Sequence, residues 1–308
     1  MNGTHICNQN TPMVAFHDRG VEAAKRRSNV PSSTSSNDGW TPAKRVEGKV
    51  AVVFGAGQSP GEGLGNGRAA AIRYAREGAR VLAANRSQKS VEETAAIIRA
   101  EGFECTPVVA DVSRESDVAG AIEEAHRRWG SVDILHNNVG VSLGTGDADT
   151  LNITEEALDE SYRVNLRGTI FACKHALPIM REQRRGAIVN ISSAAAVGLF
   201  PVVGYKATKA GVIAYTEQLA LQNAPYGIRA NCVLPGLIDT PMAVEMRVKK
   251  WNMSHEELTA QRVAKVPLGR QGTAWDVANL SLFLASDEAA FITGVSILVD
   301  GGRILNRI

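Results

Sequence analysis

Three residues in the second half of the chain have the types and spacing needed to move a proton on and off an alcohol oxygen. Tyr205 and Lys209 are four positions apart, and Ser193 lies twelve positions before Tyr205. Residues four apart share one face of a helix, so we expect the Lys209 ammonium beside the Tyr205 phenol. A phenol titrates at about pH 10, and a neighbouring cation lowers that pKa by stabilising the phenolate. Tyr205 is therefore a candidate general acid and base, with Ser193 holding the substrate oxygen.

The pair alone is weak evidence, because tyrosine and lysine at this spacing also occur on ordinary surface helices. The surrounding elements strengthen it. From Lys49 onward, short apolar runs alternate with amphipathic helical stretches. The runs are 50–54, 80–84, 105–110, 132–136, 187–191, 228–233 and 295–299, and the helical stretches are 68–77, 89–100, 115–129, 154–183, 205–223 and 273–285.

This alternation predicts an α/β fold with a doubly wound parallel sheet of the Rossmann type. Apolar strands separated by helices require a helix layer on each face, which makes a three-layer α/β/α single domain. Such sheets bind ligands beyond the carboxyl ends of their strands, where the strand order reverses. The segments at those ends are therefore the ones to inspect.

A glycine-rich loop, residues 55–67, follows the first predicted strand and contains six glycines. Glycines let backbone amides approach a pyrophosphate, and the following helix offers its amino end to the anion. The loop lacks the Gly-Lys-Ser/Thr sequence of nucleoside triphosphatases. A flexible loop without a ligand is the alternative interpretation.

Two further strand ends carry polar side chains. Asp111 and Val112 follow the third strand, where the carboxylate could bond an adenine edge or simply cap a helix. Residues 137–140, Asn-Asn-Val-Gly, follow the fourth strand, where a turn is the alternative.

Taken together, these segments resemble the short-chain dehydrogenase/reductase family in its single-domain form. The resemblance extends from about Val46 to the C-terminus. Its motifs occur in the family's order: the glycine loop, Asp111-Val112, residues 137–140, Asn165, Ser193, Tyr205 with Lys209, and Pro235-Gly236 followed by Thr240.

The resemblance implies a catalytic tetrad of Asn165, Ser193, Tyr205 and Lys209. In it, Tyr205 is the acid and base, and Ser193 polarises the substrate oxygen. Lys209 binds the nicotinamide ribose and lowers the pKa of the phenol, while Asn165 anchors a water that relays protons. Ser192 stands beside Ser193, and the position after the strand favours Ser193.

The resemblance also implies a bound nicotinamide cofactor. Thr240 would contact its carboxamide, and Asn138 would lie along it. The expected cofactor contacts are Gly55, Gly63, Leu64, Gly65, Asn85, Arg86, Asp111, Val112, Asn138, Val139, Gly140, Tyr205, Lys209, Pro235, Gly236, Ile238 and Thr240.

The glycine loop departs from the family pattern T-G-x-x-x-G-x-G. Phe54 replaces the threonine, and Gly55 and Gly63 are eight positions apart rather than four. We interpret this as a four-residue insertion around residues 58–61, with Gly55, Gly63 and Gly65 as anchors, which leaves the phosphate contacts open. Val139 stands where alanine is usual, a small enlargement that should be tolerated.

The end of the second strand favours NADP over NAD by a small margin. Family members that use NAD commonly have an acidic residue at the position of Asn85, where it bonds the ribose 2′-hydroxyl. Asn85 is uncharged, and Arg86 and Ser87 can offer donors to a 2′-phosphate. Arg86 can also stack on adenine or point to solvent, so NAD stays open.

The substrate walls are expected at residues 141–143, at 194–200 and in a lid, residues 241–266. Expected substrate contacts are Ser142, Ala195, Phe200, Met242 and Met246. The lid also carries Val244, Trp251 and Met253, and we expect its cations Arg247, Lys249 and Lys250 to form a solvated face. Apolar walls favour a medium-sized hydrophobic or alicyclic alcohol or ketone over a small charged acid.

The predicted function is therefore NAD(P)-dependent transfer of hydride between the cofactor and a secondary alcohol or ketone. The alternative enzyme is a 3-oxoacyl-thioester reductase. A regulatory protein that binds the cofactor without turnover is the non-enzyme alternative, against which the complete tetrad argues.

Composition agrees with a single-domain enzyme of ordinary charge. The 308 residues are 44% hydrophobic and carry a net charge of +2, which makes no case for nucleic acid or a membrane as partner. Four scattered cysteines and six scattered histidines predict no metal site and a reducing, cytoplasmic location. The family resemblance implies a homotetramer or homodimer with Cys173 and Cys232 buried.

Residues 1–45 differ from the remainder and are expected to be a flexible extension, with the catalytic domain at 46–308. The stretch Ser28–Asp38 is polar and without periodicity. Arg19, Lys25, Arg26 and Arg27 allow an organelle-targeting role, against which Asp18 and Glu22 count.

Overall fold

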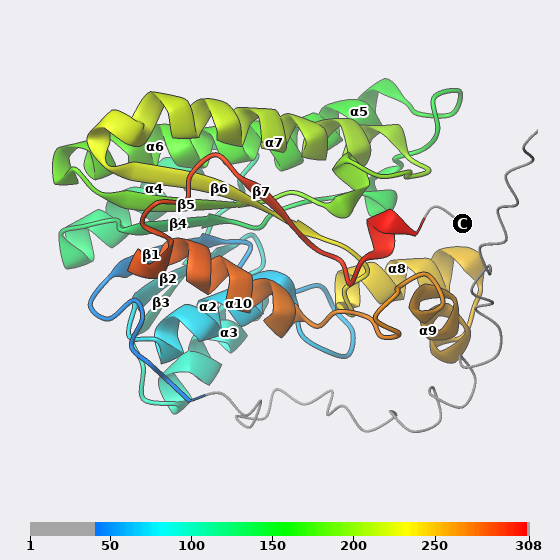
Figure 1. The fold of residues 1–308 in the computed structure, drawn as a ribbon, viewed down its shortest axis with the longest axis horizontal. Helices are drawn as coiled ribbons and strands as arrows, with labels where there is room; N and C mark the ends of the chain where they lie inside the picture. The colour runs from blue at the N-terminus through cyan, green and yellow to red at the C-terminus, as the bar shows by residue number, and fades with distance from the viewer. Residues whose placement is uncertain (1–40, 307–308) are drawn as a thin grey trace, which may run out of the picture. The chain divides into compact units, whose positions relative to one another are not determined.

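A seven-stranded parallel sheet forms the centre of the structure, a computed structural model that describes residues 41–306 (Figure 1). The predicted targeting segment and most of the predicted extension lie outside these residues. The strands are β1 (Val50–Phe54), β2 (Arg80–Asn85), β3 (Cys105–Val109), β4 (Ile134–Asn137), β5 (Gly186–Ile191), β6 (Ile228–Pro235) and β7 (Ser296–Val299). Their order is β3-β2-β1-β4-β5-β6-β7, with every neighbouring pair parallel. The predicted doubly wound fold is confirmed.

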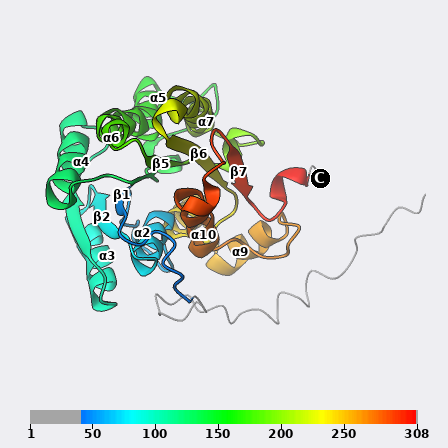
Figure 2. The same ribbon diagram turned by 60° about the vertical axis from the view of Figure 1, so that its left-hand side comes forward.

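Helices cover both faces of this sheet. The long helices are α2 (Asn66–Arg76), α3 (Gln88–Ala100), α4 (Glu115–Trp129), α5 (Glu155–Tyr162), α6 (Gly168–Gln183), α7 (Val203–Asn223), α8 (Pro241–Trp251), α9 (His255–Val263) and α10 (Ala274–Ala285). Helices α2, α3 and α10 share one apolar core with the sheet, and α4, α6 and α7 share another on the opposite face (Figures 1 and 2). The continuous apolar sequence of β1 follows from this arrangement, since all five of its residues are buried.

The strand order reverses between β1 and β4, so the loops after these strands diverge to opposite faces and leave a crevice. This edge of the sheet carries the glycine loop and residues 138–140. Among residues 41–306, no helix combines the length and apolar character required to cross a bilayer.

The stretch 154–183, predicted as one helix, is interrupted by a π-helical turn at Arg163–Arg167. This turn separates α5 from α6 and contains Asn165, whose side chain is fully buried. A π-turn adds one residue per turn and re-aims the side chains that it carries, and such turns are frequent at functional sites.

Residues 43–45, which belong to the predicted extension, contact the domain that follows. The backbone amides of Ala43 and Arg45 donate to the Glu77 carboxylate, at 3.2 and 2.9 Å. The Arg45 guanidinium also forms two hydrogen bonds with Glu288, of 2.6 and 2.7 Å. These contacts attach residues 43–45 to the domain.

Candidate active site

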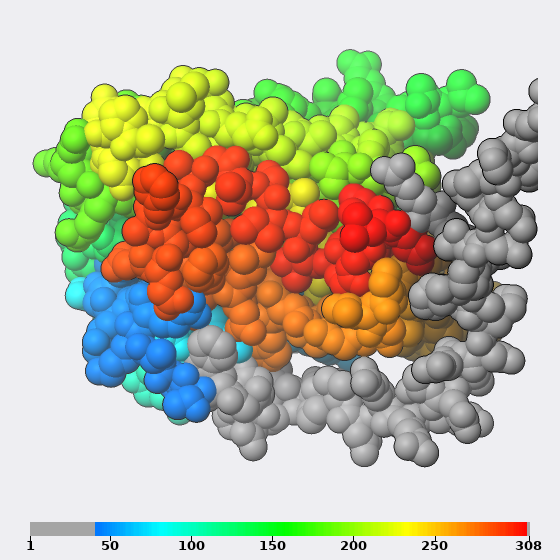
Figure 3. Space-filling model, viewed as in Figure 1, coloured from blue at the N-terminus to red at the C-terminus, as the bar shows by residue number. Residues whose placement is uncertain are grey.

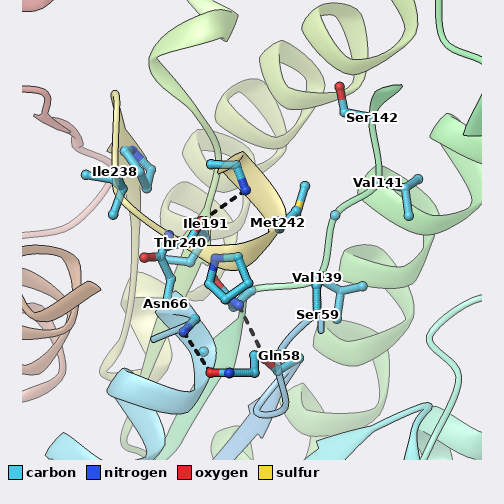
Figure 4. A pocket seen from close by; sticks show the side chains of 18 of the residues that line it. Gln58, Ser59, Asn66, Val139, Val141, Ser142, Ile191, Ile238, Thr240 and Met242 are labelled. Carbon is cyan, nitrogen blue, oxygen red and sulfur yellow. Dashed lines mark hydrogen bonds between the residues drawn. The ribbon is translucent and has the colours of Figure 1, made fainter. Parts of the chain in front are cut away.

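A cavity of about 680 Å³ opens at the carboxyl ends of the central strands (Figure 4). Ile238 and Thr240 line one side of it, Val141 and Ser142 the other, and Gln58 lies between them at the glycine loop. Most of the predicted site residues line this cavity: Gly55, Gly65, Asn85, Arg86, Asp111, Val112, Asn138, Val139, Gly140, Ser142, Ser193, Ala195, Phe200, Tyr205, Lys209, Pro235, Gly236, Ile238, Thr240, Met242 and Met246. Asn165, Gly63 and Leu64 do not.

Tyr205 stands in the first turn of α7, where a buried carboxylate from a distant loop holds the backbone. The Asp147 carboxylate accepts hydrogen bonds from the amides of Gly204, at 2.9 Å, and Tyr205, at 2.7 Å. The residue at the N-cap of α7, Val202, has no side chain that could satisfy these donors. Asp147, only 1% exposed, therefore fixes the start of the helix that carries the phenol.

The two neighbouring serines have different partners. The Ser192 hydroxyl is buried and donates to the backbone carbonyl of Lys209 at 2.7 Å. The Ser193 hydroxyl accepts from the amide of Ala195 at 3.1 Å and acts on the Tyr205 phenol as a hydrogen-bond partner that lowers its pKa. The geometry thus agrees with the preference for Ser193, which lies next to Tyr205.

Lys209 is buried beneath the cavity floor, one helical turn after Tyr205. Its ammonium donates to the carbonyl of Ile191 at 2.8 Å and to that of Val139 at 3.3 Å. Gly140 permits this approach, because a Cβ there would lie 3.1 Å from the Lys209 Nζ. Burial lowers the pKa of Lys209 to about 8.

The pKa of Tyr205 moves in the direction opposite to the predicted one. Burial raises the pKa of the phenol, while the Ser193 hydroxyl and the positive charge of Arg247 act to lower it. Lys209 is not among the groups that shift this pKa; its Nζ lies 5.9 Å from the centre of the phenol ring and bonds to backbone carbonyls. In this structure the phenol is a proton donor at neutral pH.

Asn165 acts on the backbone beside the cavity instead of lining it. Its side chain accepts from the amide of Val141 at 2.7 Å and donates to the carbonyl of the same residue at 3.0 Å. It also donates to the Thr208 hydroxyl at 3.1 Å. These bonds hold the loop after β4 against α7, so Asn165 links two walls of the site.

The glycine loop has a different register from the predicted one. Helix α2 begins at Asn66 with Gly65 as N-cap, and a Cβ on Gly67 would lie 2.0 Å from the carbonyl oxygen of Gly55. Gly65 and Gly67 are therefore the close-approach positions, whereas Leu64 packs against the apolar core. Gly65 follows Gly55 by ten positions, so the insertion is six residues long rather than four.

The far end of the cavity, at the end of β2, carries two cations as well as the Asp111 carboxylate, whose pKa the Arg86 charge acts to lower. Arg86 and Lys89 are exposed and line it, and among residues 41–306 neither makes an ion pair or a side-chain hydrogen bond. Asn85 accepts from the amide of Ser87 at 2.9 Å, which directs its oxygen into its own turn. Lys89 was missed by the sequence reasoning, although its closeness to Arg86 was a usable signal.

The lid is apolar only in part. Met242 and Met246 line the cavity as predicted, and Lys249 and Lys250 are exposed as predicted. The prediction that Arg247 is also solvated is wrong, because Arg247 is half-buried and lines the cavity.

Two further arginines, Arg262 of α9 and Arg303 near the C-terminus, also line the cavity and were not predicted. No motif surrounds either residue, so the sequence carried no signal for them. Within the described part of the chain, no group of three or more histidine, cysteine or acidic side chains could hold a metal ion.

Comparison with known proteins agrees with this architecture. A family model described as enoyl-(acyl carrier protein) reductase matches residues 62–303. The 2-(R)-hydroxypropyl-CoM dehydrogenase of Xanthobacter autotrophicus is 37% identical over 256 residues, covering 82% of this chain and 97% of that protein. The 3-oxoacyl-acyl-carrier-protein reductase of Thermotoga maritima is 35% identical over 266 residues, covering 85% of this chain and all of that protein.

Among solved structures, levodione reductase has a TM-score of 0.78 at 31% identity and covers 84% of this chain and 98% of that one. The fold, the position of the cavity and these relatives define a Rossmann-type oxidoreductase. The chain belongs to the short-chain dehydrogenase/reductase family.

Proposed function

We propose that this protein is an NAD(P)-dependent oxidoreductase that transfers hydride between a nicotinamide cofactor and a secondary alcohol or ketone. The observation that carries the proposal is that Tyr205, Ser193 and Lys209 meet in one cavity with a glycine-rich loop. The relatives include enzymes that are named for dehydrogenation of an alcohol and for reduction of a 3-oxoacyl group.

The residues present fit a dinucleotide. Gly55, Gly57, Gly65 and Gly67 line the cavity, and α2 starts there without a side-chain cap, which leaves backbone donors for a pyrophosphate. The Oδ1 atom of Asn66 is buried without a partner among residues 41–306 and could accept from a ribose hydroxyl. The other proposed cofactor contacts extend from Asn85 and Asp111 past residues 138–140 to Thr240.

The nicotinamide would supply the acceptor or donor of the hydride. In ketone reduction, the Tyr205 hydroxyl donates its proton to the carbonyl oxygen while that carbon receives the hydride. In alcohol oxidation, the phenolate takes the hydroxyl proton as the hydride leaves. Ser193 holds the same oxygen. Lys209 would bind the ribose, and its ammonium would offset the negative charge of the Tyr205 phenolate. The water relay through Asn165 stays a prediction.

For the cofactor, we favour NADP over NAD. The exposed cations Arg86 and Lys89 suit a 2′-phosphate, and no carboxylate from residue 85 would repel it. NAD is the alternative.

For the substrate, Ala195, Phe200, Met242 and Met246 supply apolar walls for a hydrophobic or alicyclic body. The Phe200 and Tyr205 rings lie 5.4 Å apart, which places this apolar surface next to the reacting oxygen. The 3-oxoacyl-thioester reductase remains the second candidate, because the relative from Thermotoga maritima is named for that activity.

A panel of ketones and alcohols tests this function through the absorbance of the reduced nicotinamide. The panel should contain steroids, cyclic alcohols and ketones, sugars and 3-oxoacyl thioesters, each with NADP and NAD. Turnover of a cyclic or steroid substrate supports the proposal. Highest efficiency with the thioesters supports the second candidate instead. Tight cofactor binding without turnover of any compound would indicate a regulatory protein.

We also propose a homotetramer or homodimer located in the cytoplasm. Cys173 and Cys232 are both completely buried, as predicted. Leu158 and Tyr162 on α5 and Leu221 on α7 are exposed apolar side chains that a subunit contact could cover. Sedimentation at micromolar concentration tests this, and a stable monomer would contradict it.

A further inference from the structure

Three arginines from three separate segments converge on the substrate end of the cavity. Arg247 comes from α8, Arg262 from α9, and Arg303 from the short turn Arg303–Leu305 after β7. The C-terminal segment packs on the lid end, since Cβ atoms on Gly301 and Gly302 would contact Val266 and Pro267. Figure 3 shows this contact as red atoms beside the orange atoms of the lid end.

Arg247 and Arg262 have backbone or amide partners, and none of the three arginines forms an ion pair with a described carboxylate. Arg247 donates to the carbonyl of Ala243 at 2.6 Å, and Arg262 donates to the carbonyl of Ile238 at 2.8 Å and to the Gln271 side chain. Arg303 has a buried Nε atom without any hydrogen-bond partner among the described atoms. No described carboxylate lies within 4.0 Å of the three.

None of the nearby described acidic residues forms an ion pair with the three arginines. Asp239 is exposed, and it is the carboxylate whose charge acts on Arg262. The Asp300 carboxylate accepts from the amides of Gly302 and Ile304, both at 2.9 Å. Glu245 lies 3.6 Å from His255. The cluster therefore keeps a net positive charge inside the cavity.

Clustered cations that are partly buried without a counterion disfavour the folded protein. Burial and repulsion by the charges of Arg247 and Arg303 lower the pKa of Arg262 to about 10, while the charge of Asp239 acts to raise it. An oxyanion would relieve this repulsion, and a guanidinium binds carboxylate, sulfonate or phosphate oxygens through two parallel hydrogen bonds. Structural arginines are usually paired with carboxylates, and these three are not.

We propose that the alcohol or ketone substrate carries an oxyanion group that Arg247 binds, with Arg262 and Arg303 adding positive charge behind it. This inference rests on the proposed function and narrows its substrate class. Arg247 and Tyr205 line the same cavity, so a substrate that reacts at Tyr205 could place its anionic group at Arg247. Ser142 also lines the cavity, and its buried hydroxyl has no described partner.

Pairs of substrates that differ only in the negative charge separate binding of the oxyanion from hydride transfer. The probes are 4-oxopentanoate, 5-oxohexanoate and 6-oxoheptanoate, each with its methyl ester, and the measurement is kcat/KM with the preferred cofactor. We expect at least one acid to be preferred over its ester. In Arg247→Gln, the acid-to-ester ratio should fall about 10- to 100-fold, the range expected for a lost charge-assisted hydrogen bond.

Arg270→Gln is the matched control, because Arg270 is exposed, pairs with Asp276 and does not line the cavity. It should leave the ratio unchanged. Cofactor affinity, measured from nicotinamide fluorescence, should change less than about 3-fold in Arg247→Gln. A loss of cofactor affinity as large as the loss of acid preference would mean that the cluster holds the cofactor pyrophosphate, and would overturn the inference.

A measurement of substrate binding distinguishes failure of the oxyanion site from failure of the proposed oxidoreductase function. If no ketone is turned over, the affinity of 5-oxohexanoate for the cofactor complex is measured by calorimetry in both proteins. Binding that is weaker in Arg247→Gln supports the oxyanion site even though the proposed function has failed. Turnover of the esters with no preference for any acid overturns the inference and leaves the function standing.

Discussion

The Asp147 carboxylate accepts a 2.7 Å hydrogen bond from the backbone amide of Tyr205 and a 2.9 Å bond from that of Gly204. A buried negative charge thus satisfies two of the free donors at the start of α7, where the helix dipole favours it. The residue that carries the proposed proton transfer is positioned by a side chain 58 positions earlier in the chain.

Replacement of Asp147 by alanine should lower both stability and turnover. Loss of a helix cap costs about 1–2 kcal/mol, and freeing the first turn of α7 displaces the phenol. Thermal unfolding and kcat measure the two effects. Thr154→Ala is the control, since Thr154 caps α5 through the amide of Ala157 outside the cavity. If both variants lose stability equally and kcat stays normal in both, Asp147 does not position Tyr205.

Replacement of Tyr205 by phenylalanine keeps the ring and removes the proton donor. Turnover should fall by at least about 10²- to 10⁴-fold, the typical contribution of a general acid or base. Cofactor affinity, followed by nicotinamide fluorescence, should change little. Near-normal turnover in this variant would show that another group moves the proton.

The buried Lys209 should make the stability difference between the wild-type protein and Lys209→Met depend on pH. Its pKa is about 8 in the folded protein and 10.5 when unperturbed, so folding opposes its protonation. Below pH 8 the buried ammonium lowers the free energy of unfolding by its full amount, and this loss disappears as the pH rises towards 10.5. The wild-type protein should therefore become more stable relative to Lys209→Met as the pH rises, by up to about 3 kcal/mol. Urea unfolding at pH 7 and pH 10 measures this gain. A constant difference between the two proteins would show that Lys209 is not strained by burial.

We expect Arg86 to make the protein prefer NADP over NAD. Wild type should have the higher kcat/KM with NADP, and Arg86→Ala should weaken NADP by about 10-fold or more while NAD changes little, because NAD lacks the phosphate. Lys89→Ala should act in the same direction, since Lys89 lines the same end of the cavity. A clear preference of wild type for NAD would contradict the prediction.

The sequence by itself determined the features that are encoded within one element or at one strand end. Tyr205 and Lys209 share a helix face because of their spacing, and the apolar runs required a parallel sheet covered on both faces. The strand ends then had to meet at one edge, so most residues at those ends could be predicted to line one cavity.

Tertiary structure decided the features that depend on how distant segments pack. Ser193 is the hydrogen-bond partner of Tyr205, because the Ser192 hydroxyl donates to the backbone carbonyl of Lys209. The glycine loop is anchored at Gly67 because its helix has to approach the carbonyl of Gly55. Arg247, Arg262 and Arg303 meet only through the folding of α8, α9 and the C-terminal turn, and no spacing along a chain encodes a contact among three separate segments.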